Sequence, residues 1–275
     1  MSSYFAGKSI LVTGSCGTVG SELIKQLLYM QEYAPSDVIG IDNNESELFF
    51  HDQYYLDDKR AQFFVIDIRD QLSLVQKMAG VDIVFHCAAL KHVILCERSP
   101  EQAVQTNIVG VQNVIAAAQQ NNVEKVIFTS SDKAVNPTSV MGTSKLMGER
   151  LMTAANSNKR VRGPIFSSTR FGNVLGSSGS VVPVFHNQIA QGGPVTLTDK
   201  KMTRFVMSIK DSVRLVIDSV IQAKGGEVFI TKMPVVRIKD LATAMIIELA
   251  PVYNYEPNTI AITEIGVKPG EKLYE

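Results

Sequence analysis

Short apolar runs and longer segments with helical spacing alternate through the first two thirds of the chain. The runs are continuously apolar, which is typical of strands buried on both faces of a sheet. Buried strands that alternate with helices predict an α/β fold with a doubly wound parallel sheet and helices on both faces. The strands are expected at residues 9–14, 38–42, 63–67, 81–88 and 125–131, and the helices at 18–31, 44–56, 70–79 and 101–122.

The pattern changes after about residue 165, where Gly, Ser and Pro become frequent. Residues 171–185 are predicted to be loops with short elements. We therefore divide the chain into a larger domain at 1–165 and a smaller lobe at 166–275, which is interleaved with the last elements of the sheet.

A glycine-rich turn joins the first predicted strand to the first predicted helix. Its three glycines have the spacing GxxGxxG, which permits a tight turn and a close approach of the backbone to a pyrophosphate. A glycine turn can also serve only strand–helix packing, but the strand before it and the helix after it favour a dinucleotide site. The expected cofactor contacts here are Thr13, Gly14, Gly17, Thr18, Val19 and Gly20.

Asp42 ends the second predicted strand, where a carboxylate can accept hydrogen bonds from the ribose of a dinucleotide. It would repel the 2′-phosphate of NADP, and no Lys or Arg lies beside it, so NAD is favoured over NADP. The alternative is that Asp42 only caps a turn or a helix. Asp67 is either an adenine contact or a helix cap, and further cofactor contacts are expected at Ile68, Ala88 and Ala89.

Composition excludes several kinds of partner. The 275 residues include 27 Lys and Arg and 27 Asp and Glu, and a formal net charge of zero argues against nucleic-acid binding. The sequence shows no apolar run long enough for a membrane span and no secretion signal. Cys16, Cys87 and Cys96 fit neither a zinc spacing nor a disulfide framework, and the histidines do not cluster with carboxylates. We expect a cytoplasmic protein without a catalytic metal.

Six blocks of the sequence resemble a known family: residues 86–93, 106–110, 130–145, 170–183, 202–207 and 268–275. They are similar to the extended short-chain dehydrogenases/reductases, and in particular to the nucleotide-sugar 4,6-dehydratases of polysaccharide biosynthesis that act on UDP-N-acetylglucosamine. The resemblance covers nearly the whole chain and implies a Rossmann-type fold, tightly bound NAD and carbon–oxygen lyase activity. Relatives continue beyond the last block, so we expect this chain to be a fragment of a longer protein.

One position departs from the usual pattern of short-chain dehydrogenases. They carry Tyr-x-x-x-Lys, whereas this sequence has Met141 followed by Lys145. A thioether cannot transfer a proton, so Met141 marks the catalytic position without acting as an acid or a base. The resemblance includes a sub-branch with Met at this position, in which the Asp–Lys pair upstream takes over proton transfer.

A 4,6-dehydration removes a hydride from carbon 4, a proton from carbon 5 and water from carbon 6, and returns the hydride to carbon 6. Lys133 is predicted to be the carbon 5 base, which requires a neutral amine, and Asp132 the acid that protonates the leaving hydroxyl. Ser131 would hold the carbon 4 hydroxyl, and the resemblance implies that Lys145 binds the nicotinamide ribose. The alternative for Asp132 and Lys133 is a solvated turn pair.

The substrate contacts follow from the same blocks. The resemblance implies that Asn173 and Arg204 bind the UDP diphosphate, while Glu271 accepts the uridine ribose hydroxyls. For each of these residues the alternative is an ordinary ion pair or loop hydrogen bond. Further substrate contacts are expected at Lys91, His92, Ser180 and Val181.

Three other features have a structural interpretation. Arg170 is either a phosphate ligand or a brace for its strand end, and Asn107 resembles a family Asn that fixes a helix kink near the catalytic Lys. The helical segments 101–122 and 143–157 could form a four-helix interface, as in relatives, which indicates a homo-oligomer.

Two other functions stay open at this point. A UDP-sugar 4-epimerase or oxidoreductase would use the same cofactor and substrate, but such enzymes normally keep the Tyr. A non-catalytic NAD-binding protein would bind the cofactor without turnover. The sequence favours the dehydratase, because Asp132, Lys133 and Lys145 stand together in one block.

Overall fold

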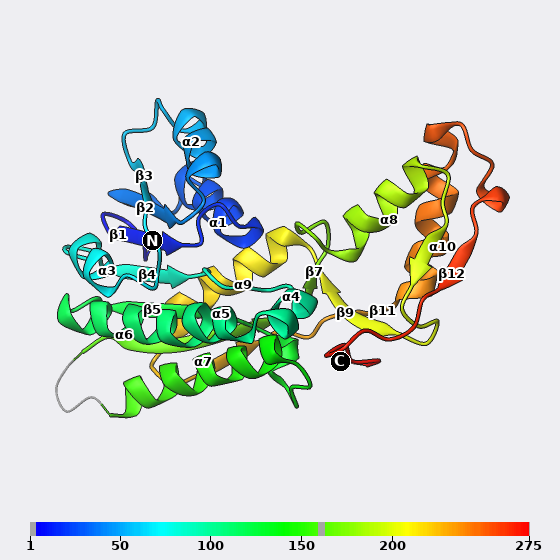
Figure 1. Ribbon diagram of the computed structural model, residues 1–275. Coiled ribbons are helices and arrows are strands. Elements are labelled where there is room, and N and C mark those ends of the chain that lie inside the picture. The colour runs from blue at the N-terminus through cyan, green and yellow to red at the C-terminus, as the bar shows by residue number, and fades with distance from the viewer. Residues whose placement is uncertain (1–3, 159–162, 275) are drawn as a thin grey trace.

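The computed structural model describes residues 4–158 and 163–274. Its centre is a seven-stranded sheet in the order β10-β6-β5-β4-β1-β2-β3, and all neighbouring strands are parallel (Figure 1). The predicted doubly wound parallel sheet is therefore confirmed. The strands are β1 (Ser9–Thr13), β2 (Asp37–Asp42), β3 (Ala61–Val65), β4 (Ile83–His86), β5 (Lys125–Ser131), β6 (Ile165–Phe171) and β10 (Val228–Ile230).

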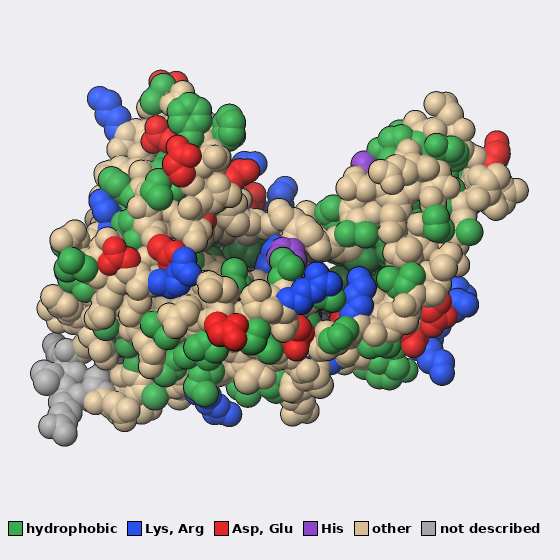
Figure 2. Space-filling model, viewed as in Figure 1, with side chains coloured by type: hydrophobic (Ala, Val, Ile, Leu, Met, Phe, Trp, Pro, Cys, Tyr) green, Lys and Arg blue, Asp and Glu red, His purple; other side chains and the backbone are tan. Residues whose placement is uncertain are grey.

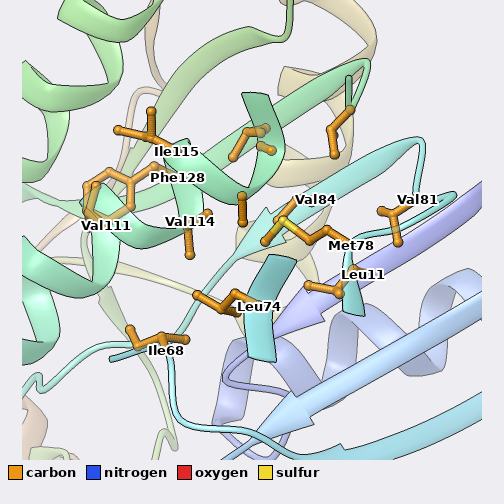
Figure 3. Close-up of a cluster of buried hydrophobic side chains, with 14 of the residues drawn as sticks. Leu11, Ile68, Leu74, Met78, Val81, Val84, Val111, Val114, Ile115 and Phe128 are labelled. Carbon is orange, nitrogen blue, oxygen red and sulfur yellow. The ribbon is translucent and has the colours of Figure 1, made fainter. Parts of the chain in front are cut away.

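The strands are continuously apolar because successive side chains enter two different cores. In β1, Leu11 packs into the core on one face, whereas Ile10 and Val12 pack into the core on the other face. α3 (Gln71–Lys77), α6 (Gly110–Gln120) and α7 (Val140–Ser157) cover the first face, and Figure 3 shows Leu11 among the side chains of that core. α1 (Thr18–Tyr29) and α9 (Ile209–Gln222) cover the second face, and α2 (Glu45–Tyr54) packs beside β3.

The sheet order reverses between β1 and β4. The chain builds β1, β2 and β3 toward one edge and then returns to place β4, β5 and β6 on the other side of β1. The carboxyl ends of β1 and β4 therefore open a crevice, which is the usual ligand-binding position in such sheets.

The predicted helix at 101–122 is divided into three parts. α5 (Pro100–Val104) is followed by a π-helical turn at Gln105–Val109 and then by α6. A further short helix, α4 (Val93–Arg98), precedes them and was not predicted.

The smaller lobe has its own sheets (Figure 1), and its buried side chains form a core of their own. The prediction of loops at 171–185 is wrong at its end, because α8 begins at Val181. Val181, Phe185 and Ile189 repeat every four residues and pack against the lobe core, and neither Pro183 in the first turn nor the preceding glycines prevent the helix. The elements are β7 (Asn173–Val174), α8 (Val181–Ala190), β8 (Val195–Leu197), β9 (Thr203–Met207), β11 (Val235–Arg237), α10 (Ile238–Leu249) and β12 (Ile262–Glu264).

The main sheet includes β6, which begins at Ile165, and β10, which follows the first elements of the smaller lobe, so the chain returns to the larger domain after entering the smaller lobe. The domain boundary at 165 stays a prediction. Within the described residues, every helix is too short or too polar to cross a membrane.

Candidate active site

A cavity of about 620 Å³ lies at the carboxyl edge of the parallel sheet. The glycine turn, the ends of β2, β4 and β5, and the loop after β7 form its walls. Figure 2 shows that the surface is hollowed between the larger domain and the smaller lobe. The predicted residues that line it are Gly14, Gly17, Thr18, Val19, Gly20, Asp42, Asp67, Ile68, Ala88, Ala89, Lys91, His92, Ser131, Lys133, Met141, Lys145, Asn173, Ser180 and Glu271.

The glycine turn has no room for side chains at two of its three glycines. Gly14 has a φ of +69°, and a Cβ there would lie 2.6 Å from the backbone nitrogen of Ala88. A Cβ on Gly20 would lie 2.2 Å from the carbonyl oxygen of Gly14. Gly17 is the N-cap of α1, so unpaired N–H groups of the helix open onto the cavity. This turn can accommodate a pyrophosphate.

Thr13 does not reach the cavity, which corrects its assignment as a cofactor contact. Its side chain is fully buried, and its hydroxyl accepts a hydrogen bond from the Ala88 N–H (3.2 Å). The same hydroxyl lies 2.7 Å from Nδ1 of His86. Thr13 therefore stabilises the segment between β4 and α4 through hydrogen bonds inside the protein.

Two carboxylates line the far end of the cavity. Asp42 accepts hydrogen bonds from the N–H groups of Cys16 (3.1 Å) and Asn44 (3.0 Å), which fix it beside the glycine turn. Asp67 is bonded by the guanidinium of Arg69, whose side-chain hydrogen bonds lower the pKa of Asp67. Both carboxylates offer oxygens that can accept hydrogen bonds from ribose or adenine.

Ser131, Asp132 and Lys133 form a cluster directly after β5. The Ser131 hydroxyl donates to Oδ1 of Asp132 (2.8 Å), and Lys133 Nζ donates to the same oxygen (3.2 Å). Lys133 Nζ also donates to Oδ1 of Asn173 (3.3 Å). Ser131 and Lys133 line the cavity, whereas Asp132 is buried behind them at 8% exposure and lines neither cavity described here. The pair is a positioned ion pair, not a solvated turn.

Lys145 lies on α7 and is almost completely buried. Its Nζ donates to the carbonyl oxygen of Thr129 (2.9 Å) and lies 4.8 Å from the ring centre of Phe128. Burial lowers the pKa of Lys145 to about 8. Lys145 therefore places a positive charge against the cavity wall at neutral pH.

Met141 lies one turn before Lys145 on α7 and is 3% exposed. It packs with Cys96 and Ala103 and contributes to the cavity wall. This wall is apolar at the position where the short-chain dehydrogenases that the sequence resembles carry a Tyr hydroxyl. The Met141 thioether supplies no proton here.

Asn107 lies inside the π-helical turn, which agrees with the kink implied by the resemblance. Its Oδ1 accepts from Leu90 N (2.8 Å), and its Nδ2 donates to Leu90 O (2.9 Å) and to the Ser144 hydroxyl (2.9 Å). π-helical turns often occur at functional sites because they reposition one side chain. Asn107 connects the loop after β4 to α7 next to Lys145.

A second cavity of about 220 Å³ extends toward the smaller lobe, and Ser180, Val181, Arg204 and Glu271 line it. The Arg204 guanidinium donates to the carbonyl oxygens of Thr203 (2.8 Å) and Lys272 (2.8 Å). Arg204 therefore holds the C-terminal segment in place, in addition to any role toward phosphate. Glu271 lines both cavities and connects them.

Arg170 braces its strand end and does not line either cavity. Its Nε and a terminal nitrogen donate to the two carboxylate oxygens of Glu149 (2.7 and 2.6 Å), and the Ser130 hydroxyl donates to the same carboxylate (2.5 Å). The phosphate alternative for Arg170 is therefore wrong. This paired arrangement is typical of a buried Arg–carboxylate bond.

Several cavity residues were missed in the sequence. Lys268 belongs to the same sequence block as Glu271 and adds a cation near it, so that block contained a usable signal. Residues 177–179 line the cavity through a loop whose place over the site no local pattern reveals. Lys91 and His92, which were predicted, also line the cavity, with the His92 ring against Gly179 of this loop, and burial lowers the pKa of both.

The sequence matches the family described as polysaccharide biosynthesis protein over residues 10–275. It is 50% identical to an uncharacterized membrane protein of Methanocaldococcus jannaschii, over 100% of this chain and 81% of that protein. It is 41% identical to a UDP-N-acetylglucosamine 4,6-dehydratase (inverting) of Campylobacter jejuni, over 98% of this chain and 77% of that enzyme. The chain therefore belongs to the polysaccharide biosynthesis family of extended short-chain dehydrogenases/reductases, which confirms the resemblance.

Some other similar proteins are named as epimerases and not as dehydratases. A UDP-glucose 4-epimerase of Rickettsia canadensis is 38% identical, over 98% of this chain and 77% of that enzyme. Among solved structures, Pen from Bacillus thuringiensis has a TM-score of 0.94 at 43% identity and covers 98% of this chain and 81% of its own. DesIV, a dTDP-glucose 4,6-dehydratase from Streptomyces venezuelae solved with NAD and TYD, has a TM-score of 0.85 at 23% identity over 97% of this chain and 87% of its own, and it shares the fold.

Proposed function

We propose that the protein catalyses the NAD-dependent 4,6-dehydration of UDP-N-acetylglucosamine, or of a closely related UDP-N-acetylhexosamine, to a 4-keto-6-deoxy sugar nucleotide. The observation that carries the proposal is the Ser131–Asp132–Lys133 cluster at the cavity, with Met141 in place of the usual Tyr. The similarity to a 4,6-dehydratase at 41% identity supports it.

The residues of the main cavity fit a dinucleotide. The N-terminus of α1 opens onto the cavity at Gly17, and Asp42 suits a free ribose hydroxyl better than the 2′-phosphate of NADP. Asp67 and Ile68 would lie at the adenine end, and Lys145 at the nicotinamide ribose. When bound, NAD supplies a hydride acceptor for carbon 4 and, once reduced, a hydride donor for carbon 6.

Proton transfer would be carried out by the Asp132–Lys133 pair. In the reactive form Lys133 is a neutral amine and Asp132 is a carboxylate, joined by a 3.2 Å hydrogen bond, so that Asp132 can take up the carbon 4 hydroxyl proton and Lys133 the carbon 5 proton. After oxidation at carbon 4, Lys133 accepts the carbon 5 proton, and Asp132 gives its proton to the hydroxyl that leaves carbon 6 as water. Lys133 then returns the proton to carbon 5 when hydride reaches carbon 6.

The carbon 4 hydroxyl also needs a proton acceptor during hydride removal. The Ser131 hydroxyl lines the cavity and donates to Oδ1 of Asp132, so a substrate hydroxyl bonded to Ser131 is connected to that carboxylate. This route would replace the missing Tyr. At the other end of the substrate, Arg204 and Glu271 would bind the UDP group. Asn173, which is bonded to Lys133, would lie between that group and the sugar, with Lys91 and His92 as further substrate contacts.

The experiment is incubation with UDP-N-acetylglucosamine and NAD in deuterated water, followed by mass and NMR analysis of the product. Loss of one water with one deuterium at carbon 5 is the expected outcome. A carbon 4 epimer of unchanged mass would instead support a UDP-sugar 4-epimerase, the second candidate, which the epimerase names among relatives favour. Bound NAD without turnover would support a non-catalytic binding protein.

We also propose a homo-oligomer. The outer sides of α5 and α7 expose Val104 (43%) and Met147 (45%), as a helical interface between subunits would require. Sedimentation of the wild type and of Met147→Glu tests this, and a wild-type monomer would contradict it.

A further inference from the structure

A loop from the smaller lobe lies across the main cavity. It comprises residues 175–180 between β7 and α8, and residues 177–179 line the cavity beside the glycine turn. Gly176 and Gly179 have φ angles of +74° and +69°, a conformation that glycine adopts without strain. We name this segment the crossing loop.

The crossing loop contacts the larger domain at two points. The backbone N–H of Ser178 donates to the hydroxyl of Thr18, the first residue of α1, at 3.3 Å. Gly179 lies against the ring of His92, the N-cap of α4, so closely that an added Cβ would be 2.3 Å from Cε1. The loop is therefore attached to the phosphate end of the cavity through Thr18 and to the opposite wall through His92.

We propose that the crossing loop is a latch that closes over the bound dinucleotide and sets how long the cofactor stays. The inference rests on the proposed dehydratase function, in which the hydride taken from carbon 4 must be returned to carbon 6 of the same substrate molecule. If the reduced cofactor left in between, a dehydrated ketone would remain without its hydride donor. A dinucleotide between the glycine turn and the crossing loop is released only when the contacts at Thr18 and His92 open.

Two glycines of the loop offer a matched pair of substitutions. Gly179→Ala introduces both backbone strain and a collision with His92, whereas Gly176→Ala introduces similar backbone strain with nothing within 4 Å of the new Cβ. Each variant is loaded with NADH, and the fall in NADH fluorescence after addition of excess NAD gives the release rate. We expect release to be about tenfold faster from Gly179→Ala than from Gly176→Ala. Equal rates for the two variants would overturn the latch.

The two anchors are tested separately. His92→Ala should speed NADH release on its own. In the His92→Ala background, Gly179→Ala should speed NADH release no more than Gly176→Ala does, because the ring with which the new Cβ collides is gone. If the effects of His92→Ala and Gly179→Ala on the NADH release rate multiplied fully, the contact between these two residues would be contradicted. Thr18→Val should release NADH faster than Thr18→Ser, which keeps the acceptor for Ser178, and no difference between them would count against this anchor.

The readout separates the latch from the proposed reaction. NADH release is measured without a sugar nucleotide, so the predicted order of rates can hold even if the wild type fails to dehydrate UDP-N-acetylglucosamine. In that case the latch stands and the proposed function falls. Conversely, a wild type that dehydrates its substrate while all variants release NADH at one rate removes the latch alone.

Discussion

The two ends of the active site are built in different ways. At the cofactor end, Gly14, Gly17 and Gly20 lie within one turn, and Asp42 ends the neighbouring strand of the same sheet. At the substrate end, distant segments meet, as when Arg204 of β9 donates to the carbonyl oxygen of Lys272. The first end depends on local backbone geometry, whereas the second depends on how the smaller lobe packs. Substitutions at the two ends should therefore affect different measured quantities.

The largest effect is expected where the two ends meet, at Lys133. Lys133→Met removes the amine that receives the carbon 5 proton and should lower kcat about 10³-fold, within the range that general acid–base groups contribute. NADH affinity should stay within about twofold, because the glycine turn is untouched. Product formation in steady state and NADH fluorescence titration measure the two quantities.

A matched control for this charge loss is Lys200→Met. Lys200 is an exposed cation of the smaller lobe, paired with Glu264 at 3.5 Å, and a surface pair of this kind contributes little. Its kcat should equal that of the wild type. If Lys133→Met retained wild-type kcat, the proton-transfer role of the cluster would be wrong.

The next largest effect is expected on NADH binding, from a substitution in the glycine turn at the cofactor end. Gly20→Ala places a Cβ 2.2 Å from the Gly14 carbonyl oxygen, which forces α1 away from the turn. Strain of this kind should weaken NADH binding about 100-fold. Gly17→Ala meets the same oxygen at 3.2 Å and should weaken binding much less. Equal losses for the two variants would show that the turn does not bind the pyrophosphate closely.

A third prediction concerns the charge of Lys145. Burial lowers its pKa from 10.5 to about 8, so the folded protein loses this positive charge as the pH rises above about 8. If the charge assists cofactor binding and hydride transfer, kcat/KM should fall about tenfold per pH unit above that value. Lys145→Arg should give a lower but flat profile, because the guanidinium stays charged. A wild-type profile that is flat to pH 10 would contradict this role.

The same group has the opposite effect on stability. Between about pH 8 and 10.5 Lys145 is neutral in the folded state but still charged in the unfolded state. The unfolded state then binds more protons, so the contribution of Lys145 to the free energy of unfolding increases with pH across this window. In Lys145→Met this increase should be absent, as urea denaturation at several pH values would show. Activity and stability should therefore change in opposite directions with pH.

The sheet was predictable because its signal is local. Each strand is a short apolar run with turn residues at its ends, and β5 was predicted with the bounds that the structure has. The glycine turn was predictable for the same reason. α8 was missed because Ser, Gly and Pro surround its start, and its helical spacing is stabilised only by the core of the smaller lobe.

The site was predictable in part. The cluster at Asp132 and Lys133 follows a strand in the sequence, so its place at the sheet edge followed from the fold. The sequence did not show that Thr13 would be buried beneath the cavity, or that Asp132 would stand behind Ser131. How deeply a side chain is buried depends on packing between distant segments, which local sequence patterns do not encode.

The smallest of these effects tests the substrate end alone. Arg204→Lys keeps the positive charge but cannot reproduce two nitrogens that donate to the carbonyl oxygens of Thr203 and Lys272. The C-terminal segment that carries Glu271 should loosen, and the KM for UDP-N-acetylglucosamine should rise about fivefold at nearly constant kcat. Arg237→Lys on the adjoining strand β11 is the control and should leave KM unchanged. NADH release should be unaffected in both variants, because the contacts at Thr18 and His92 remain, and a faster release from Arg204→Lys would show that the two ends are not independent.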